Sequence, residues 1–179
     1  MLGALAVGGY TAGLLHLLSH AAFKALLFLG AGVIAHAIGT TMLSGMGGLR
    51  RSMPLTYLMS TLGLAALMGL PPLGGFFSKE SVLAAAEEAA LHAGPLPPWA
   101  AWLVLLAGLF TVLVTAAYAT RAWLLAFRGP TRSVSATAHD PPPPMRFALV
   151  MLAVPTVLLA ALAFMPSVVV AMLNPGVGV

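Results

Sequence analysis

The chain has 179 residues, of which 60% are hydrophobic and only 7% are charged, and its net charge is +4. Soluble domains typically carry about 25% charged residues, so this composition excludes a water-soluble globule and indicates an integral membrane protein. The absence of cysteine excludes disulfides and thiolate ligation of metals or iron–sulfur clusters. The basic residues lie in short loops or singly within apolar runs, which favours a role in membrane topology over a nucleic-acid partner.

We expect an all-α, polytopic transmembrane bundle of about four spans, preceded by the stub of a helix in residues 1–9. A bilayer core requires about 20 apolar residues per helix. The stretches that meet this length are about 11–38, 54–91 with an interruption, 99–127 and 146–172. The sequence begins within an apolar segment and shows no basic segment typical of a secretory signal. This beginning predicts a fragment or a start codon assigned too late.

The first predicted span carries an unusual stripe of ionisable residues, in the sequence HLLSHAAFKALLF. His16, His20 and Lys24 recur every four residues, so the stripe turns by only about 40° per step and we expect all three side chains to line one cavity. A lone histidine on an apolar face is usually a satisfied core residue, but a stripe shared with a lysine favours a proton path. No carboxylate or cysteine accompanies the histidines, so we expect no metal site. His36, near the end of the span, is a weaker candidate for a proton exit group.

The second stretch predicts a broken helix rather than one continuous rod. Pro71 and Pro72 remove two backbone donors, and glycines at 69, 74 and 75 surround them. Unwound backbone in a membrane is tolerated where it is buried in protein or lines a wet cavity, and broken helices mark ion sites in transporters. A hinge without a chemical role, or a re-entrant hairpin, is the alternative.

Lys79 lies near the start of the second half-helix. A lysine at the bilayer centre costs at least about 2.5–3.5 kcal/mol on insertion scales, so it normally faces the bundle interior and serves a function; snorkelling to the interface is the alternative. Glu80 points about 100° away from Lys79 and either pairs with a neighbouring helix or subunit or favours the helix start. We expect Glu87 and Glu88 to be interfacial. Burial disfavours the charged form of an amine, and histidine titrates near neutrality, so such groups in series can pass protons through water.

The loops between the spans predict the orientation in the membrane. The loops at 39–53 and 128–145 fall on one side, and with the adjacent helix end they hold five basic residues: Arg50, Arg51, Arg128, Arg132 and Arg146. The positive-inside rule makes that side cytoplasmic, with the termini and the 92–98 turn outside. The four prolines at 141–144 favour an extended segment. His92, His139 and Asp140 are loop residues that belong to no constellation.

The motifs resemble the antiporter-like membrane subunits, of the subunit L type, of NADH-quinone oxidoreductase (respiratory complex I). HLLSHAAFKALLFLGAGVIAHAIGT, GMGGLRRSMPLTYL and GLPPLGGFFSKESVL occur in this order over roughly residues 1–90, and AYATRAWLLAFRG adds a weaker similarity to high-GC bacteria such as actinobacteria. The resemblance implies a non-redox, proton-translocating subunit in a bacterial plasma membrane. NADH, FMN, iron–sulfur clusters and quinone are then expected in partner subunits, with no cofactor in this chain.

The resemblance also implies roles for individual residues. Lys24 falls on the family's central-axis lysine, His16 and His20 on its connecting histidines, and Lys79 on the lysine of the second broken helix. Residues 1–91 then correspond to the second of two half-channels, and residues 92–179 to two further helices. The first half-channel and a long lateral helix are absent, so we expect a C-terminal-half fragment that is inactive alone. The alternatives are the equivalent component of a multisubunit Na⁺/H⁺ antiporter, which shares the lysine and histidine pattern, and a non-catalytic helical scaffold.

Overall fold

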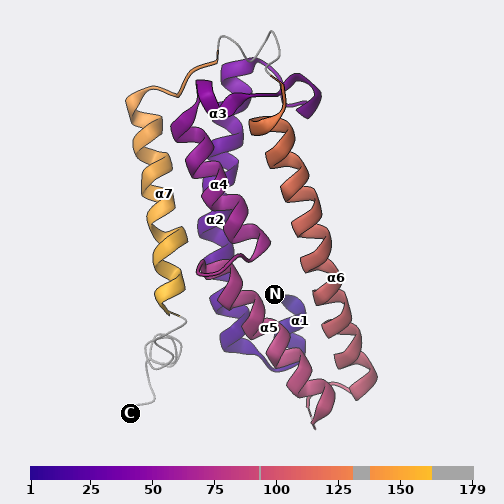
Figure 1. The fold of residues 1–179 in the computed structure, drawn as a ribbon. Coiled ribbons are helices and arrows are strands. Elements are labelled where there is room, and N and C mark those ends of the chain that lie inside the picture. The colour runs from indigo at the N-terminus through magenta and orange to yellow at the C-terminus, as the bar shows by residue number, and fades with distance from the viewer. Residues whose placement is uncertain (93, 131–137, 163–179) are drawn as a thin grey trace, which may run out of the picture.

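The structure is a computed structural model that describes residues 1–92, 94–130 and 138–162, and helices account for its architecture (Figure 1). In chain order the elements are α1 (Leu2–Ala6), α2 (Tyr10–Ile38), the 3-10 turn η1 (Leu43–Gly45), α3 (Leu49–Ser52), α4 (Pro54–Met68), α5 (Gly74–Leu91), α6 (Pro98–Trp123), the π-helical turn η2 (Leu124–Arg128) and α7 (Pro143–Leu162). No β-strand occurs within the described ranges. The predicted all-α transmembrane fold is confirmed.

Among the described residues, three continuous segments are long and apolar enough to cross a membrane: Tyr10–Ile38, Pro98–Arg128 and Pro143–Ala161. The remaining predicted span, residues 54–91, corresponds to α4 and α5 together. At 1.5 Å per residue the 15 residues of α4 reach only about 22 Å, short of a hydrocarbon core of about 30 Å. Figure 1 shows α5 continuing from the end of α4 toward the opposite end of the bundle. The predicted broken helix is therefore confirmed.

Prolines mark the starts of α4 at Pro54, α6 at Pro98 and α7 at Pro143. The N–H groups of the first helical turn have no hydrogen-bond partner within the helix, so proline, which lacks an N–H, fits there. This corrects the predicted extended loop at 128–145, because Pro143 and Pro144 form the first turn of α7. Residues 131–137 of that loop, and the last part of the predicted fourth span, lie outside the described residues.

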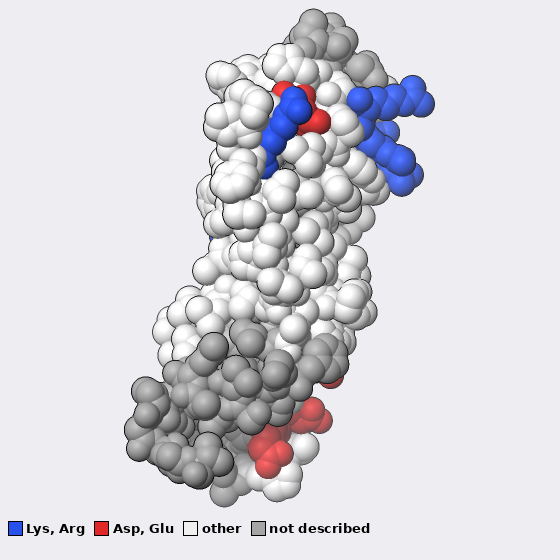
Figure 2. Space-filling model, turned by 90° about the vertical axis from the view of Figure 1, so that its left-hand side faces the viewer, with Lys and Arg blue, Asp and Glu red and all other residues white. Residues whose placement is uncertain are grey.

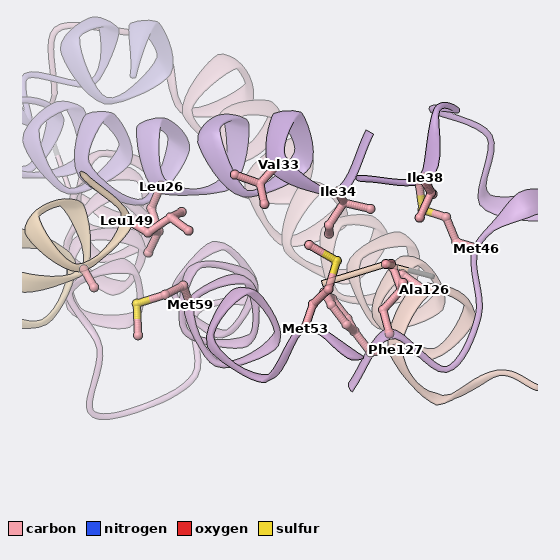
Figure 3. Packing of buried hydrophobic residues seen from close by; sticks show 13 residues of the cluster. Leu26, Val33, Ile34, Ile38, Met46, Met53, Met59, Ala126, Phe127 and Leu149 are labelled. Atoms are coloured by element: carbon pink, nitrogen blue, oxygen red, sulfur yellow. The ribbon is translucent and has the colours of Figure 1, made fainter. Parts of the chain in front are cut away.

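A hydrophobic cluster joins α2, α4, η2 and α7 (Figure 3). Its members with labels in the figure are Leu26, Val33, Ile34, Ile38, Met46, Met53, Met59, Ala126, Phe127 and Leu149. Toward the other end, α5 and α6 meet through Ala86, Ala89, Ala90 and Ala101. Small residues let membrane helices approach closely, where van der Waals contact provides the packing energy.

Charge is distributed unevenly between the two ends of the bundle. Figure 2 shows Lys and Arg gathered near one end, and most of the visible Asp and Glu near the other. At the end we call the basic end, α3 with Arg50 and Arg51 packs against η2 with Arg128. The prediction that the 39–53 and 128–145 loops share one end is confirmed for their described residues, while the side of the membrane that this end faces stays a prediction.

Candidate functional site

The break between α4 and α5 is a short turn that backbone hydrogen bonds close. Gly69 ends α4 with a left-handed φ of +81°, and its N–H donates to the carbonyls of Ala65 and Ala66, both at 3.1 Å. Leu73 N–H donates to Leu70 O at 3.1 Å, and α5 begins at the next residue. The turn satisfies part of the α4 C-terminus locally, which leaves other carbonyls available for side chains.

Glycines allow the two half-helices to overlap at the break. A Cβ on Gly75 would lie 1.8 Å from the carbonyl oxygen of Ala66, so the first turn of α5 passes directly against the last turn of α4. A Cβ on Gly74 would lie 3.2 Å from the backbone nitrogen of Ala160 in α7 and 3.4 Å from Ser19 Oγ in α2. Four helices therefore converge on this turn, and there is no space for a side chain at Gly75.

Lys79 reaches back from α5 to the end of α4. Its half-buried side chain extends alongside Gly69, and Nζ donates a hydrogen bond of 2.5 Å to the carbonyl of Leu67. The carbonyls at a helix C-terminus carry a partial negative charge, which an ammonium group stabilises. The prediction that Lys79 faces the interior agrees with this contact rather than with snorkelling.

His16 is joined to α5 through Ser78, the residue before Lys79. The fully buried Ser78 hydroxyl donates to Gly75 O at 3.4 Å, and it lies 3.0 Å from His16 Nδ1. A hydroxyl can both donate and accept, so the tautomer of the His16 ring decides which partner donates in this contact. The ring centroids of His16 and His20 lie 6.1 Å apart.

One cavity of about 330 Å³ brings His16 and Lys79 together, although 63 positions separate them in the sequence. Its other walls come from α1, α5 and α6, and they include Ala4, Leu83, Val104 and Thr111. The space is large enough for several waters, and Thr111 adds a hydroxyl to the two ionisable side chains. The arrangement therefore leaves open space between the imidazole and the amine.

His20 and Lys24 do not line this cavity, which differs from the single cavity that the stripe predicts. The half-buried His20 ring packs edge-on to Phe23 at 5.3 Å, and the exposed Lys24 places Nζ 5.5 Å from the Phe28 ring centroid. The physical reason is the drift along the helix, because two steps of about 40° turn Lys24 roughly 80° away from His16. Lys24 therefore lies on the open face of α2.

The remaining predicted residues lie away from the cavity. Glu80 is exposed on α5, and the exposed Glu88 carboxylate lies 3.4 Å from Nδ1 of the exposed His92. His36 is exposed at the basic end and lines a separate cavity of about 190 Å³ with His139. Within the described residues, no group of three or more His, Asp or Glu side chains is arranged to hold a metal ion.

Two serines at the break were missed by sequence reasoning. Ser78 orients His16, and Ser19 is the one buried side-chain polar atom in the described chain that has no hydrogen-bond partner. Ser19 Oγ lies beside Gly74, where a water molecule would satisfy it. The available signal was their spacing: Ser78 directly precedes Lys79, and Ser19 directly precedes His20.

Asp140 was also missed, and it holds the opposite end of α4. No side chain adjacent to Pro54 caps this helix. Instead the Asp140 carboxylate accepts hydrogen bonds from Leu55 N–H (3.0 Å), Thr56 N–H (3.0 Å) and the Thr56 hydroxyl (2.9 Å). The signal was indirect, since a helix that follows Met53-Pro54 has no capping residue of its own and needs one from elsewhere.

Comparison with known proteins places these residues in a family context. Residues 1–115 match the family model described as "NADH:quinone oxidoreductase/Mrp antiporter, TM". The chain is 39% identical over 155 residues to NADH-quinone oxidoreductase subunit L of Rickettsia bellii, which covers 85% of this chain and 22% of the relative. It is 37% identical over 172 residues to subunit L of Mycobacterium tuberculosis, covering 95% and 26%. It is 38% identical over 167 residues to NADH-ubiquinone oxidoreductase chain 5 of Triticum aestivum, covering 91% and 24%. The chain thus spans about a quarter of the length of these relatives.

Proposed function

Because the chain belongs to the NADH:quinone oxidoreductase/Mrp antiporter transmembrane family, we propose that it is a proton-translocating membrane subunit of an NADH-quinone oxidoreductase. The observation that carries this proposal is the shared cavity of His16 and Lys79 at the break between α4 and α5. An imidazole and an amine, joined by space for water inside a membrane bundle, are suited to proton transfer.

The Lys79 contact suggests how the amine takes part. Its ammonium form is attracted to Leu67 O and to the negative end of the α4 dipole. Release of the proton removes that attraction, so the neutral amine is free to turn on its flexible stem toward the cavity. The contact with Ser78 occupies His16 Nδ1 and leaves Nε2 to exchange a proton with cavity water.

The open face of α2 suggests where the path continues. Lys24 is exposed there, and a lysine facing lipid is costly at membrane depth. We therefore expect another membrane segment or partner subunit to cover this face and to connect Lys24 with His20 and His16. On this proposal the chain alone does not pump, because Lys24 has no enclosed surroundings.

The redox chemistry belongs to partner subunits on this proposal. The chain has no cysteine for iron–sulfur ligation, and the relatives carry the names of subunits of NADH-quinone or NADH-ubiquinone oxidoreductases. NADH, FMN, the iron–sulfur clusters and quinone are thus assigned to other chains, and this one couples quinone reduction to proton movement. The basic end, with Arg50, Arg51 and Arg128, faces the cytoplasm of a bacterial plasma membrane by the positive-inside rule.

Substitutions of Lys79 in the assembled oxidoreductase test the proton path. Lys79→Ala removes the amine. Lys79→Arg keeps a hydrogen-bond donor for Leu67 O, but the guanidinium group is not deprotonated in proteins. Both variants should lower the protons moved per NADH oxidised, measured in inverted vesicles with a pH-sensitive dye while NADH oxidation is followed in parallel. Glu87→Gln, on the exposed surface of the same helix, is the control.

The outcomes separate the alternatives. If Lys79→Arg pumps normally, the residue has only a structural role as a helix cap. If Lys79→Ala and Lys24→Ala both leave pumping unimpaired, the chain is a scaffold. The family description also includes Mrp antiporters, so the measurement should be repeated with and without Na⁺. Dye responses that require Na⁺ and not NADH would favour a component of an antiporter.

A further inference from the structure

A second polar cavity lies at the basic end, far from the break. It has a volume of about 290 Å³ and is formed by two segments that are distant in sequence. Gly48, Arg50 and Arg51 come from the start of α3, and Phe127 to Pro130 follow the end of α6. The backbones meet closely, since a Cβ on Gly129 would lie 3.8 Å from the Cα of Gly47. The fold thus builds this cavity from a tertiary contact.

The cavity concentrates positive charge without a compensating acid. Three arginines line it, Arg50, Arg51 and Arg128, and no carboxylate does. The chain has four acidic residues, of which Glu80, Glu87 and Glu88 lie on α5. The fourth, Asp140, is engaged by the N-terminus of α4. Within the described ranges none of the three guanidinium groups lies within ion-pair distance of a carboxylate, and the acid–base contact found there is between Glu88 and His92 at the opposite end.

Two of the guanidinium groups are held in place by aromatic rings. Arg50 Cζ lies 5.5 Å from the Tyr57 ring centroid, and Arg128 Cζ lies 5.1 Å from the Trp123 centroid. These distances place both guanidinium groups beside the rings, and the N–H edge of a guanidinium carries its hydrogen-bond donors. That edge matches the oxygens of a phosphate in bidentate geometry, and ordering it before binding lowers the entropic cost of binding.

We propose that this cavity, which we call the arginine pocket, binds the phosphodiester of an anionic phospholipid headgroup. Its position supports a lipid source, because it lies at the ends of membrane-length helices, where headgroups are found. Trp123 and Tyr57, which contact two of its arginines, are residues of the kind that favour the membrane interface. Basic pockets between transmembrane helices suit acidic headgroups. The proposal is independent of the proton path, since the pocket shares no residue with the cavity of His16 and Lys79.

Native mass spectrometry of the full chain in detergent tests the proposal, with phosphatidylglycerol as the probe and phosphatidylcholine as the zwitterionic reference. Arg128→Gln removes one guanidinium from the pocket. Arg121→Gln is the matched control, since it removes the same charge from an exposed position on the same α6 and lies outside the pocket. Hydrogen bonds to charged groups are among the stronger ones, so Arg128→Gln should weaken phosphatidylglycerol binding at least tenfold. Arg121→Gln should change it less than twofold.

Each other result counts against the proposal. Equal losses in the two variants would mean attraction by net charge without a pocket, and equal retention of the two lipids would mean that the headgroup charge is not recognised. A third arm adds inorganic phosphate at millimolar concentration. Complete displacement of phosphatidylglycerol by phosphate alone would assign the pocket to a soluble phosphate. Arg128→Lys, which keeps the charge but loses the fork, should bind with intermediate affinity. Helical circular dichroism of every variant verifies that the fold is intact.

Discussion

The two ends of α4 receive opposite charges from distant parts of the chain. At its N-terminus, Asp140 accepts hydrogen bonds from two backbone N–H groups and the Thr56 hydroxyl. At its C-terminus, the Lys79 ammonium donates to Leu67 O. Both charges have the sign that the helix dipole favours at that end. The same electrostatic rule therefore fixes both ends of one short membrane helix.

The difference between these ends lies in the number of bonds and in the space beside them. Asp140 is held by three contacts of 2.9 to 3.0 Å at once, on a short side chain. Lys79 makes one hydrogen bond, on a long side chain, and it borders a cavity that it shares with His16. The comparison shows that a charged side chain at a helix end is held in one position when it has several hydrogen-bond partners there. A charged side chain that has one such partner and borders a cavity can change partners.

The largest effect is expected from placing a side chain where the two half-helices are in contact. Gly75→Ala would place a methyl group 1.8 Å from the carbonyl oxygen of Ala66, so the backbone of one half-helix must move. We expect the free energy of unfolding to fall by about 3 kcal/mol, the upper end for overpacking, in denaturant titrations followed by circular dichroism. Gly32→Ala, where a Cβ meets nothing within 4 Å, should leave stability unchanged or slightly raised. Equal behaviour of the two variants would contradict the close approach at the break.

The second largest effect is expected at the N-terminus of α4, which Asp140 caps. Asp140→Ala removes the acceptor of three hydrogen bonds, and we expect a loss of about 2 kcal/mol in the same titration. Asp140→Asn keeps one carbonyl oxygen and should lose about half of that. Glu87→Ala removes an exposed carboxylate and should cost almost nothing. A negligible loss in Asp140→Ala would mean that the start of α4 does not depend on this residue.

Ser78→Ala should have a smaller effect, near the C-terminus of α4 where Lys79 and His16 lie. It removes the hydrogen-bond partner of His16 Nδ1, so stability should fall by about 1 kcal/mol, and the imidazole loses its orientation. In the assembled oxidoreductase we expect fewer protons per NADH oxidised. Ser81→Ala is the matched control, because the Ser81 hydroxyl donates to Phe77 O within its own helix. If both serine variants pump equally well, His16 does not need this contact.

The smallest effect is expected along the side of α4, away from both of its ends. Trp123→Phe removes the hydrogen bond of 2.9 Å from Trp123 Nε1 to the Thr61 hydroxyl, while that hydroxyl still donates to Tyr57 O. We expect a loss of about 0.5 kcal/mol and unchanged proton pumping. A larger loss than for Asp140→Ala would show that side packing, and not the end contacts, dominates the stability of α4.

The sequence predicts the break and the interior position of Lys79 because both follow from local chemistry. Prolines lack backbone donors, and a lysine in a long apolar stretch must find a partner. The identity of that partner depends on how far the half-helices overlap, which residue spacing does not determine. The role of Asp140 was inaccessible for the same reason, since its partners on α4 lie about 85 positions away. The expectation that Lys24 shares a cavity with His16 stays a prediction, because a small angular drift accumulates over two turns and places Lys24 on the exposed face of α2.

The half-length of α4 has an electrical consequence. Because α4 ends partway through the bundle, the amine of Lys79 lies at an intermediate depth, separated from each aqueous phase by one half-helix. A full elementary charge that crosses a membrane gains about 2.3 kcal/mol per 100 mV, so a proton at roughly mid-depth experiences about half of that. On the proposed proton path, loading and unloading this amine would each be voltage-sensitive, and the membrane potential would bias the protonation of the group.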